Sequence, residues 1–289
     1  SFEFKQAAPL GFGMEVLRSS AREIKETWIP VLKRKSSILN HCRELTLELK
    51  EKEFPRRQMN LVFRVFDDGV AFRTEFIGPD NHHEYVLTNE LTTFNFTADH
   101  TCWAADHKDY SSSQENEYFK RNISEITDKM VIGLPMTVKV ADDCYAAITE
   151  AKITNYAGMT LKPFLSKTGF AVCSQLAPLP GEQVNGDNVR FKFPHQTPWR
   201  VIMLGSTPGG LVESEIIMNL NEPCAIADPG WIKPGISAWD HWWSGEVRMD
   251  NETIRKYIGL AAEMGWPYQI IDWQWYGKFN SPEADITKV

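Results

Sequence analysis

The stretch Phe63-Arg64-Val65-Phe66-Asp67-Asp68-Gly69-Val70-Ala71-Phe72-Arg73 decides the fold class of this chain. Valine and phenylalanine dominate residues 60–66, an acidic turn with a glycine follows, and a second β-like run covers residues 70–77. Two such runs joined at Asp-Gly are the strongest short-range signal for a β-hairpin. We therefore expect antiparallel strands in this part of the chain.

Similar runs recur on both sides of the hairpin, separated at short intervals by turns such as Gly78-Pro79-Asp80-Asn81. The further predicted strands are residues 44–50, 91–97, 130–140, 144–151, 169–173, 189–193, 199–205 and 211–220. In the last of these, Glu213 and Glu215 alternate and are interpreted as a solvated strand face. Many short strands with such turns predict a sandwich of two antiparallel sheets.

The pattern changes at Asp228–Pro234, where two prolines and a glycine suggest a linker. A short apolar strand is predicted at 235–239 and another at 268–272. Between them, Ile254, Tyr257, Ile258 and Ala261 follow the i, i+3, i+4, i+7 spacing of one helical face. A β–α–β unit implies parallel strands. We therefore divide the chain into a sandwich, 1–230, and the β–α–β part, 231–289.

Composition excludes several classes of protein. The chain has 289 residues, 43% of them apolar and 24% charged, which is typical of a globular protein with a sizeable core. The net charge is −7 and no basic stripe is visible, so a nucleic-acid partner is not expected. No apolar run approaches the roughly 18–20 residues that span a bilayer. The five cysteines are widely spaced without a CxxC pair, and we interpret them as buried free thiols.

Known nucleotide-binding and hydrolase motifs are missing from the sequence. It contains no GxGxxG after a strand, no GxxxxGK[ST], no HExxH and no GxSxG. Nucleotide-dependent enzymes, zincins and α/β-hydrolases are therefore unsupported.

Tryptophan is concentrated near the end of the chain, with seven of the ten Trp residues in 231–289. Two clusters follow the two predicted parallel strands: Trp239-Asp240-His241-Trp242-Trp243 and Asp272-Trp273-Gln274-Trp275-Tyr276. Aromatic rings stack on the C–H faces of sugars, and carboxylates accept hydrogen bonds from sugar hydroxyls. The clusters therefore suggest a carbohydrate pocket, although Trp can also simply fill a barrel rim and His241 can be a packed histidine.

Several segments, in this order, resemble glycoside hydrolase family 97. They are Pro9-Leu10-Gly11, the hairpin 63–73, Ile148-Thr149-Glu150-Ala151, Ala238–Trp243 and Ile271–Gly277. The resemblance implies an N-terminal β-supersandwich followed by a catalytic (β/α)8 barrel, of which 231–289 would be the first β–α–β unit. It also implies an α-glycosidase that uses calcium, acts on glycosides or oligosaccharides, and is periplasmic or secreted.

The resemblance assigns roles to individual residues. Glu150, which from the sequence alone is most simply an exposed strand-end acid, resembles the sandwich glutamate that reaches the calcium ion. Asp240 and Asp272, with Trp239 and Trp273, resemble pocket residues that contact the terminal sugar. His241 and Trp275 lie in the same clusters and are further candidates for substrate binding. No catalytic residue is assigned, because the family's catalytic carboxylates belong to later barrel strands and are expected beyond Val289.

The same resemblance leads us to expect a particular substrate specificity and an incomplete enzyme. Asp272-Trp273-Gln274-Trp275 differs from the Asp-Glu-Gly-Trp of α-glucosidase members, which favours the α-galactosidase branch. The chain reads as a truncated enzyme, inactive by itself. If Glu150 is a calcium ligand, we expect its carboxylate to point toward Asp240 and Asp272 and not to be held in an ion pair within the sandwich.

Two alternatives from other classes remain. A non-catalytic carbohydrate-binding sandwich would place aromatic side chains on an exposed sandwich face. A mutarotase-like enzyme would need a His/Glu pair in the sandwich cleft, and the sequence shows no sign of one.

Overall fold

The computed structural model describes residues 1–289 except 33–34, 79–83, 167–168, 185, 240–250 and 272–289. The chain forms two compact units. The first contains residues 1–29 and 37–225, and the second contains 30–36 and 226–289. From the sequence we placed the division at residue 230; in the structure it falls between Ala225 and Ile226.

The first unit contains sixteen strands, β1 to β16, among its described residues. Their bounds are β1 Phe2–Phe4, β2 Met14–Trp28, β3 Ile38–Glu51, β4 Gln58–Phe66, β5 Gly69–Ile77, β6 Tyr85–Glu90, β7 Thr93–Asn95, β8 Thr101–Ala105, β9 Tyr118–Asn122, β10 Met136–Ala141, β11 Cys144–Ala151, β12 Met159–Pro163, β13 Ala171–Leu176, β14 Val189–Phe191, β15 His195–Gln196 and β16 Trp199–Gly205. The helical elements of this unit are the 3-10 turn η1 Ile123–Glu125, α1 Pro208–Glu213 and α2 Ile216–Asn219.

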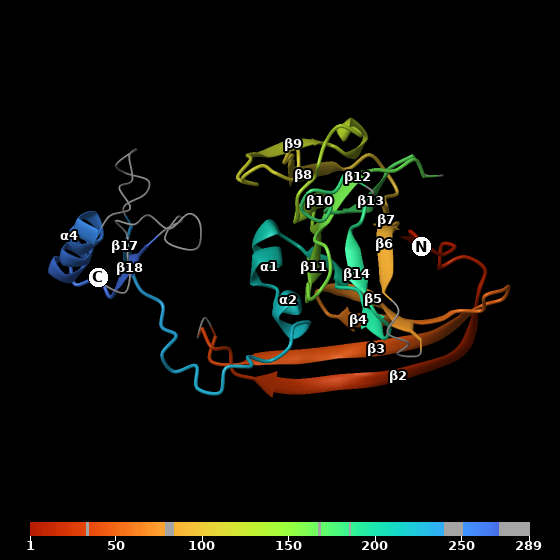
Figure 1. Cartoon of the computed structure of the whole chain (residues 1–289), viewed down its shortest axis with the longest axis horizontal. Coiled ribbons are helices and arrows are strands. Elements are labelled where there is room, and N and C mark those ends of the chain that lie inside the picture. The colour runs from red at the N-terminus through yellow and green to blue at the C-terminus, as the bar shows by residue number, and fades with distance from the viewer. Residues whose placement is uncertain (33–34, 79–83, 167–168, 185, 240–250, 272–289) are drawn as a thin grey trace. The chain divides into compact units, whose positions relative to one another are not determined.

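Antiparallel pairing joins these strands into one large sheet and two small ones (Figure 1). The ten-stranded sheet has the order β2-β3-β4-β5-β16-β11-β10-β8-β9, with β15 also paired to β5. The small sheets have the orders β1-β6-β14 and β12-β13-β7. The predicted antiparallel β-sandwich is therefore confirmed.

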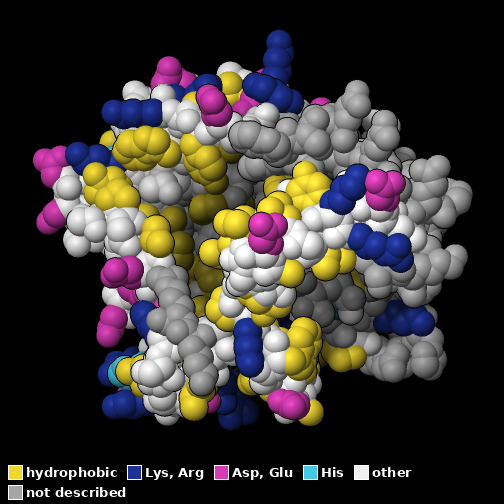
Figure 2. All heavy atoms as spheres, turned by 90° about the vertical axis from the view of Figure 1, so that its left-hand side faces the viewer, with side chains coloured by type: hydrophobic (Ala, Val, Ile, Leu, Met, Phe, Trp, Pro, Cys, Tyr) yellow, Lys and Arg dark blue, Asp and Glu magenta, His cyan; other side chains and the backbone are white. Residues whose placement is uncertain are grey.

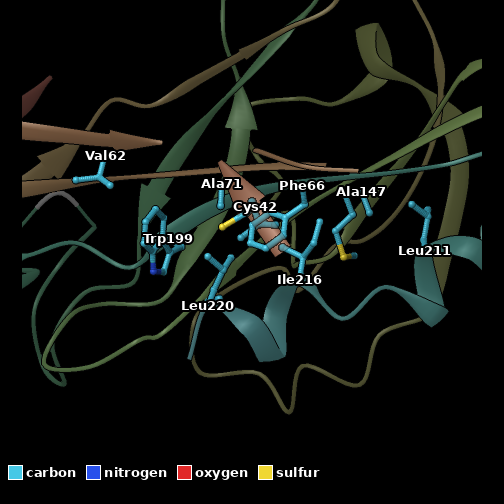
Figure 3. Packing of buried hydrophobic residues seen from close by; sticks show 12 residues of the cluster. Cys42, Val62, Phe66, Ala71, Ala147, Trp199, Leu211, Ile216 and Leu220 are labelled. Carbon is cyan, nitrogen blue, oxygen red and sulfur yellow. The ribbon is translucent and has the colours of Figure 1, made fainter. Parts of the chain in front are cut away.

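Three apolar clusters hold these layers together. Two lie between the large sheet and the small sheets, with Phe76 against Leu87 in one and Ile148 against Leu161 in the other. The third lies on the opposite face of the large sheet, where α1 and α2 pack (Figure 3). Figure 3 shows Ile216 and Leu220 directed at the sheet residues of this cluster. Both faces of the large sheet are therefore covered around β16 and β11.

The hairpin that decided the fold class is β4–β5. Phe66 pairs with Gly69, so Asp67 and Asp68 form the two-residue turn and Gly69 begins the second strand. Gly69 has φ +154°, and a Cβ atom there would lie 2.4 Å from the carbonyl oxygen of Ile202. Glycine is required at this position because β16 approaches the hairpin backbone too closely for a side chain.

The predicted strand at 211–220 is wrong, because this segment forms α1 and α2. Thr207 caps the first helix by accepting a hydrogen bond from the Gly210 N–H, and Pro208 occupies the first turn. Threonine at the cap and proline just inside it are a strong helix-start signal. Glu213 is consequently an exposed helical residue, and the alternation with Glu215 does not reflect a strand face.

Seven strands of the first unit were not predicted: β1, β2, β6, β8, β9, β12 and β15. The longest of them is β2, with fifteen residues. The predicted run 130–140 becomes a strand only from Met136. All five cysteines are free, as predicted. Cys42, Cys102 and Cys173 are buried as expected, whereas Cys144 is half-buried and Cys224 is exposed, so the prediction is wrong for these two.

In the second unit, β17 (Ser237–Trp239) and β18 (Tyr268–Ile270) pair in parallel, and α4 (Asn251–Glu263) packs on both. Of the predicted apolar face, Ile254 and Ala261 are buried, whereas Tyr257 is half-buried and Ile258 is exposed. The Trp266 N–H bonds the Ala261 carbonyl at 2.8 Å, and Gly265 has φ +67°. The helix thus ends at a C-cap glycine. The β–α–β unit is present, while the rest of a barrel remains an expectation.

On the side drawn in Figure 2, acidic and basic side chains are interspersed. Within the described ranges, no helix is long and apolar enough to cross a membrane.

Candidate functional site

A buried charge cluster joins β6, β11 and β16 on the inner side of the large sheet. Its centre is Arg200, whose Nε donates to Glu90 Oε1 at 2.8 Å and whose Nη2 donates to Glu90 Oε2 at 2.6 Å. The side chains of Arg200 and Glu90 are only 1% and 2% exposed. This is a bidentate arginine–carboxylate pair, a geometry that fixes the orientation of the guanidinium plane.

Glu150 is the third charged member of the cluster. It lies directly opposite Arg200 in the β11–β16 register, so both side chains emerge on the same face of the sheet. Arg200 Nη1 donates to Glu150 Oε2 at 2.5 Å, and the Met159 backbone N–H donates to Glu150 Oε1 at 2.9 Å. The Glu150 side chain is 9% exposed, so it reaches the boundary of the cluster while Arg200 and Glu90 lie inside it.

Two hydroxyl groups complete the coordination of Glu90. The Thr92 hydroxyl donates to Oε1 at 2.8 Å, and the Tyr156 hydroxyl donates to Oε2 at 2.8 Å. The Tyr156 ring stacks against His195, with the ring centroids 6.1 Å apart. Each oxygen of Glu90 therefore accepts two hydrogen bonds, which is what a fully buried carboxylate needs.

The cluster contains one cation and two carboxylates, and their pKa values reflect this imbalance. Burial by itself would raise the pKa of Glu90, but the charge and hydrogen bonds of Arg200 hold it below its ordinary value. Burial raises the pKa of Glu150, and Arg200 and the Met159 N–H only partly oppose it. Arg200 therefore compensates the burial of Glu90 more fully than the burial of Glu150.

A profile of the glycosyl-hydrolase 97 N-terminal domain matches residues 1–223, more than three quarters of the chain. The chain belongs to glycoside hydrolase family 97. The resemblance inferred from the hairpin, the Glu150 segment and the tryptophan clusters is therefore confirmed.

Two curated family 97 relatives are similar to this chain. The "Retaining alpha-galactosidase" of Bacteroides thetaiotaomicron is 28% identical over 303 residues, which cover 94% of this chain and 44% of the relative. The "Probable retaining alpha-galactosidase" of Streptomyces bingchenggensis is 25% identical over 295 residues, covering 98% of this chain and 42% of the relative. The chain thus spans less than half the length of each.

Solved family 97 structures share the fold. A family 97 enzyme from Pseudoalteromonas sp. strain K8, in complex with acarbose, superposes with a TM-score of 0.79 at 24% identity, over 99% of this chain and 46% of that one. A beta-arabinopyranosidase superposes with a TM-score of 0.77 at 20% identity, over 95% of this chain and 44% of that one. At these identities the likeness concerns the fold alone.

The predicted sugar pocket of this family 97 chain is described only in part. Trp239 is half-buried at the end of β17 and pairs in register with Ile270, so the two parallel strands end side by side. The other candidates, Asp240, His241, Asp272, Trp273 and Trp275, lie outside the described residues. Their sugar contacts therefore stay predictions, as does the expected common direction of Glu150, Asp240 and Asp272.

The described residues do not form a whole calcium site, and Glu150 stays a predicted ligand. Among them, no three His, Cys, Asp or Glu side chains gather as a metal-binding group. The expectation that Glu150 is not held in an ion pair within the sandwich is wrong, because Arg200 pairs with it. Each oxygen of Glu150 accepts one hydrogen bond here, so each keeps a lone pair of the kind that a Ca²⁺ ligand uses.

The alternatives find little support among the described residues. The three sandwich tryptophans, Trp28, Trp103 and Trp199, are half-buried or buried and do not form an exposed platform. The guanidinium groups of Arg64 and Arg73 lie over the Trp199 ring. The described His/Glu pair, His41 with Glu23, lies on the exposed β2–β3 hairpin, outside the cleft that a mutarotase would use.

The inference from sequence missed Glu90, Arg200 and Tyr156. Arg200 carried a usable signal, because it stands inside the apolar run Trp199–Leu204 and a charge buried in such a strand requires a partner. Nothing in the sequence identified Glu90 as that partner, since 110 residues separate the two.

Proposed function

We propose that this chain is the sandwich and first β–α–β unit of an α-glycosidase that removes terminal α-galactosyl groups with retention of configuration. The observation that carries the proposal is the family 97 match over residues 1–223. The names of the two curated relatives favour the galactoside branch, as does the Asp272-Trp273-Gln274-Trp275 segment. Terminal α-glucosides are the alternative substrate.

The acids of the sandwich are not proposed as the catalytic pair. Retention requires two carboxyl groups about 5–5.5 Å apart on either side of the glycosidic bond. Glu90 and Glu150 both bond to one guanidinium, so Arg200 occupies the space between them. Glu90 is also completely buried, which leaves it no access to a sugar. The nucleophile and the acid/base are therefore proposed to come from other barrel strands.

The two described strand ends of the β–α–β unit are proposed to supply part of the sugar pocket. In barrels of this type the carboxyl ends of the parallel strands carry the active site. Trp239 lies at such an end, and its indole ring can stack on one face of a pyranose. Asp240 and Asp272 would accept hydrogen bonds from the sugar hydroxyls, and His241, Trp273 and Trp275 would complete the wall.

Calcium is proposed as the cofactor, with Glu150 as the ligand that the sandwich contributes. A bound Ca²⁺ would supply positive charge close to the substrate. The support is the composition of the cluster, one guanidinium for two carboxylates, and the place of Glu150 at its boundary. The remaining oxygen ligands of the 6–8 that Ca²⁺ usually takes are expected from the barrel.

The test uses the enzyme that carries this chain. We expect faster turnover of p-nitrophenyl α-galactoside than of the α-glucoside, and NMR of the first-formed sugar should show the α-anomer. Chelation with EGTA should lower the activity, and added calcium should restore it. Faster glucoside turnover would overturn the galactosidase assignment, and a β-anomer as the first product would overturn retention. No turnover of either substrate would overturn the glycosidase assignment itself.

A further inference from the structure

The buried charge cluster around Arg200 has a different stoichiometry from the cluster at Glu44. At Glu44, one carboxylate lies between two guanidinium groups, those of Arg22 and Arg64. Around Arg200 the ratio is reversed, because one guanidinium lies between the carboxylates of Glu90 and Glu150. A cluster with a net charge of −1 that is almost excluded from water is costly to bury without a counter-ion.

The two carboxylates differ in the hydrogen bonds that they accept. Glu90 accepts the bidentate pair of hydrogen bonds from Arg200 and one from each of two hydroxyl groups, so its position is fixed and its charge is compensated. Glu150 receives the one remaining nitrogen, Nη1, and a backbone N–H. Arg200 is therefore oriented by Glu90, and Glu150 is oriented by Arg200.

A role in stability alone does not explain the second carboxylate. A buried ion pair is at best weakly stabilising relative to apolar packing, and a third charged group adds a further desolvation cost. A glutamine at position 150 would avoid that cost and give up one of the two hydrogen bonds, because Arg200 and Met159 donate to different oxygens and an amide has only one oxygen. Residues that are kept at a cost to stability are expected at functional sites.

We propose that Glu90 and Arg200 are positioning residues for Glu150. Glu90 takes up the charge of Arg200, and Arg200 then fixes the Glu150 carboxylate by one hydrogen bond while leaving its negative charge available to a divalent cation at the end of β11. The inference rests on the proposed role of Glu150 as a calcium ligand. It adds that calcium affinity depends on a buried carboxylate that never touches the ion.

The experiment measures calcium binding directly in the enzyme that carries this chain. Isothermal titration with CaCl₂ and the calcium-induced rise in Tm are recorded for the wild type and for Glu90→Gln. Without the Glu90 charge, Arg200 is neutralised by Glu150 alone, so the cluster no longer carries a net negative charge. The Kd for calcium should rise roughly tenfold, comparable to the effect of Glu150→Gln.

Two further variants separate this effect from a general loss of stability. Glu51→Gln makes the same change in another arginine pair, since Glu51 bonds Arg57 through both of its oxygens. This control should lower Tm and leave the calcium Kd unchanged. Tyr156→Phe removes a single hydrogen bond from Glu90 and should raise the Kd about two- to threefold with the fold intact.

The outcomes distinguish the two proposals. If Glu150→Gln weakens calcium binding while Glu90→Gln and Tyr156→Phe leave it unchanged, the positioning role is wrong and the calcium role stands. If Glu150→Gln has no effect on calcium binding, both are wrong. Should Glu90→Gln fail to fold, Tyr156→Phe decides, and an unchanged Kd in that variant overturns the positioning role.

Discussion

Replacing Arg200 by methionine should be among the most destabilising single changes in the sandwich. The substitution approximately keeps the volume of the side chain and removes the one cation that both Glu90 and Glu150 share. Glu90 would keep only the hydroxyl groups of Thr92 and Tyr156 as partners, in a position that is 1% exposed. Removing one partner of a buried ion pair costs about 3–5 kcal/mol.

The magnitude can be compared with that of a pair in the same unit whose cation is exposed to solvent. Arg190 bonds Asp187 with an N–O distance of 2.7 Å; the Asp187 side chain is 5% exposed, but the Arg190 side chain is 49% exposed, and Lys5 also bonds Asp187. Water screens such pairs, and their contribution is at most about 1 kcal/mol. For a unit of this size, 1 kcal/mol corresponds to about 2–4 °C in Tm. We therefore expect Arg200→Met to lower Tm by roughly 6–20 °C and Arg190→Met by about 4 °C or less.

Urea unfolding at pH 7 measures the difference in unfolding free energy between the two variants. Far-UV circular dichroism is a suitable signal, because the strands that dominate it belong to the first unit. The triple variant Arg200→Met, Glu90→Met, Glu150→Gln provides a second check, since it removes all the buried charges together and should recover much of the lost stability. If Arg200→Met proves no more destabilising than Arg190→Met, the two carboxylates are not the buried, arginine-dependent charges that the structure shows.

Three other predictions concern the turn, the acid stability and the activity of the chain. Gly69→Ala should lower the free energy of unfolding by about 1–3 kcal/mol, measured by urea titration, because its Cβ would meet the Ile202 carbonyl and its φ is strained for alanine; an unchanged midpoint would contradict this. Hydrogen bonds from Arg57 hold the pKa of Glu51 below its ordinary value, so this stabilisation is present above about pH 4.5 and is lost as the pH falls through the lowered pKa. Glu51→Gln should therefore flatten the drop of Tm between pH 4.5 and pH 2.5, and an equally steep drop would refute the assignment. Finally, the 289-residue chain alone should not hydrolyse p-nitrophenyl α-galactoside or α-glucoside, since Arg200 separates the two acids that the sandwich brings together; clear turnover would show that a catalytic pair exists within it.

The sequence predicted those elements whose local pattern agrees with their tertiary surroundings. The β4–β5 hairpin, β11 and β16 are apolar runs ended by turn residues, and each is found where the pattern places it. The helix α4 shows a regular apolar spacing with a glycine cap. In these segments the local propensity and the buried face favour the same structure.

The strand β2 could not be predicted in this way, because its pairing is determined from outside the segment. Its sequence mixes Glu, Arg, Lys and Ser with a few apolar residues, and nearly all of its side chains are exposed. It is an edge strand that pairs only with β3 along almost its whole length. Charged residues are common on such edges because they discourage pairing with other chains, and they leave no alternating pattern.

The residues of the candidate site could also be predicted only in part from the sequence. Glu150 was identified from the family resemblance, whereas Arg200 and Glu90 emerged only from the three-dimensional pairing of β16 with β11 and β6. The buried strand Trp199–Gly205 predicts that Arg200 must have a partner. Which acid fills that role depends on contacts between residues up to 110 positions apart, and no local pattern specifies them.

The end of β11 links the candidate site to the point where the chain leaves the sandwich. Two residues after Glu150, the Lys152 N–H donates to Asn221 Oδ1 at 3.1 Å, and the Lys152 ammonium forms an ion pair with Glu222. Asn221 and Glu222 lie within four residues of Ala225, where the first unit ends. The same strand end therefore positions Glu150 through Arg200 and anchors the exit segment through Lys152.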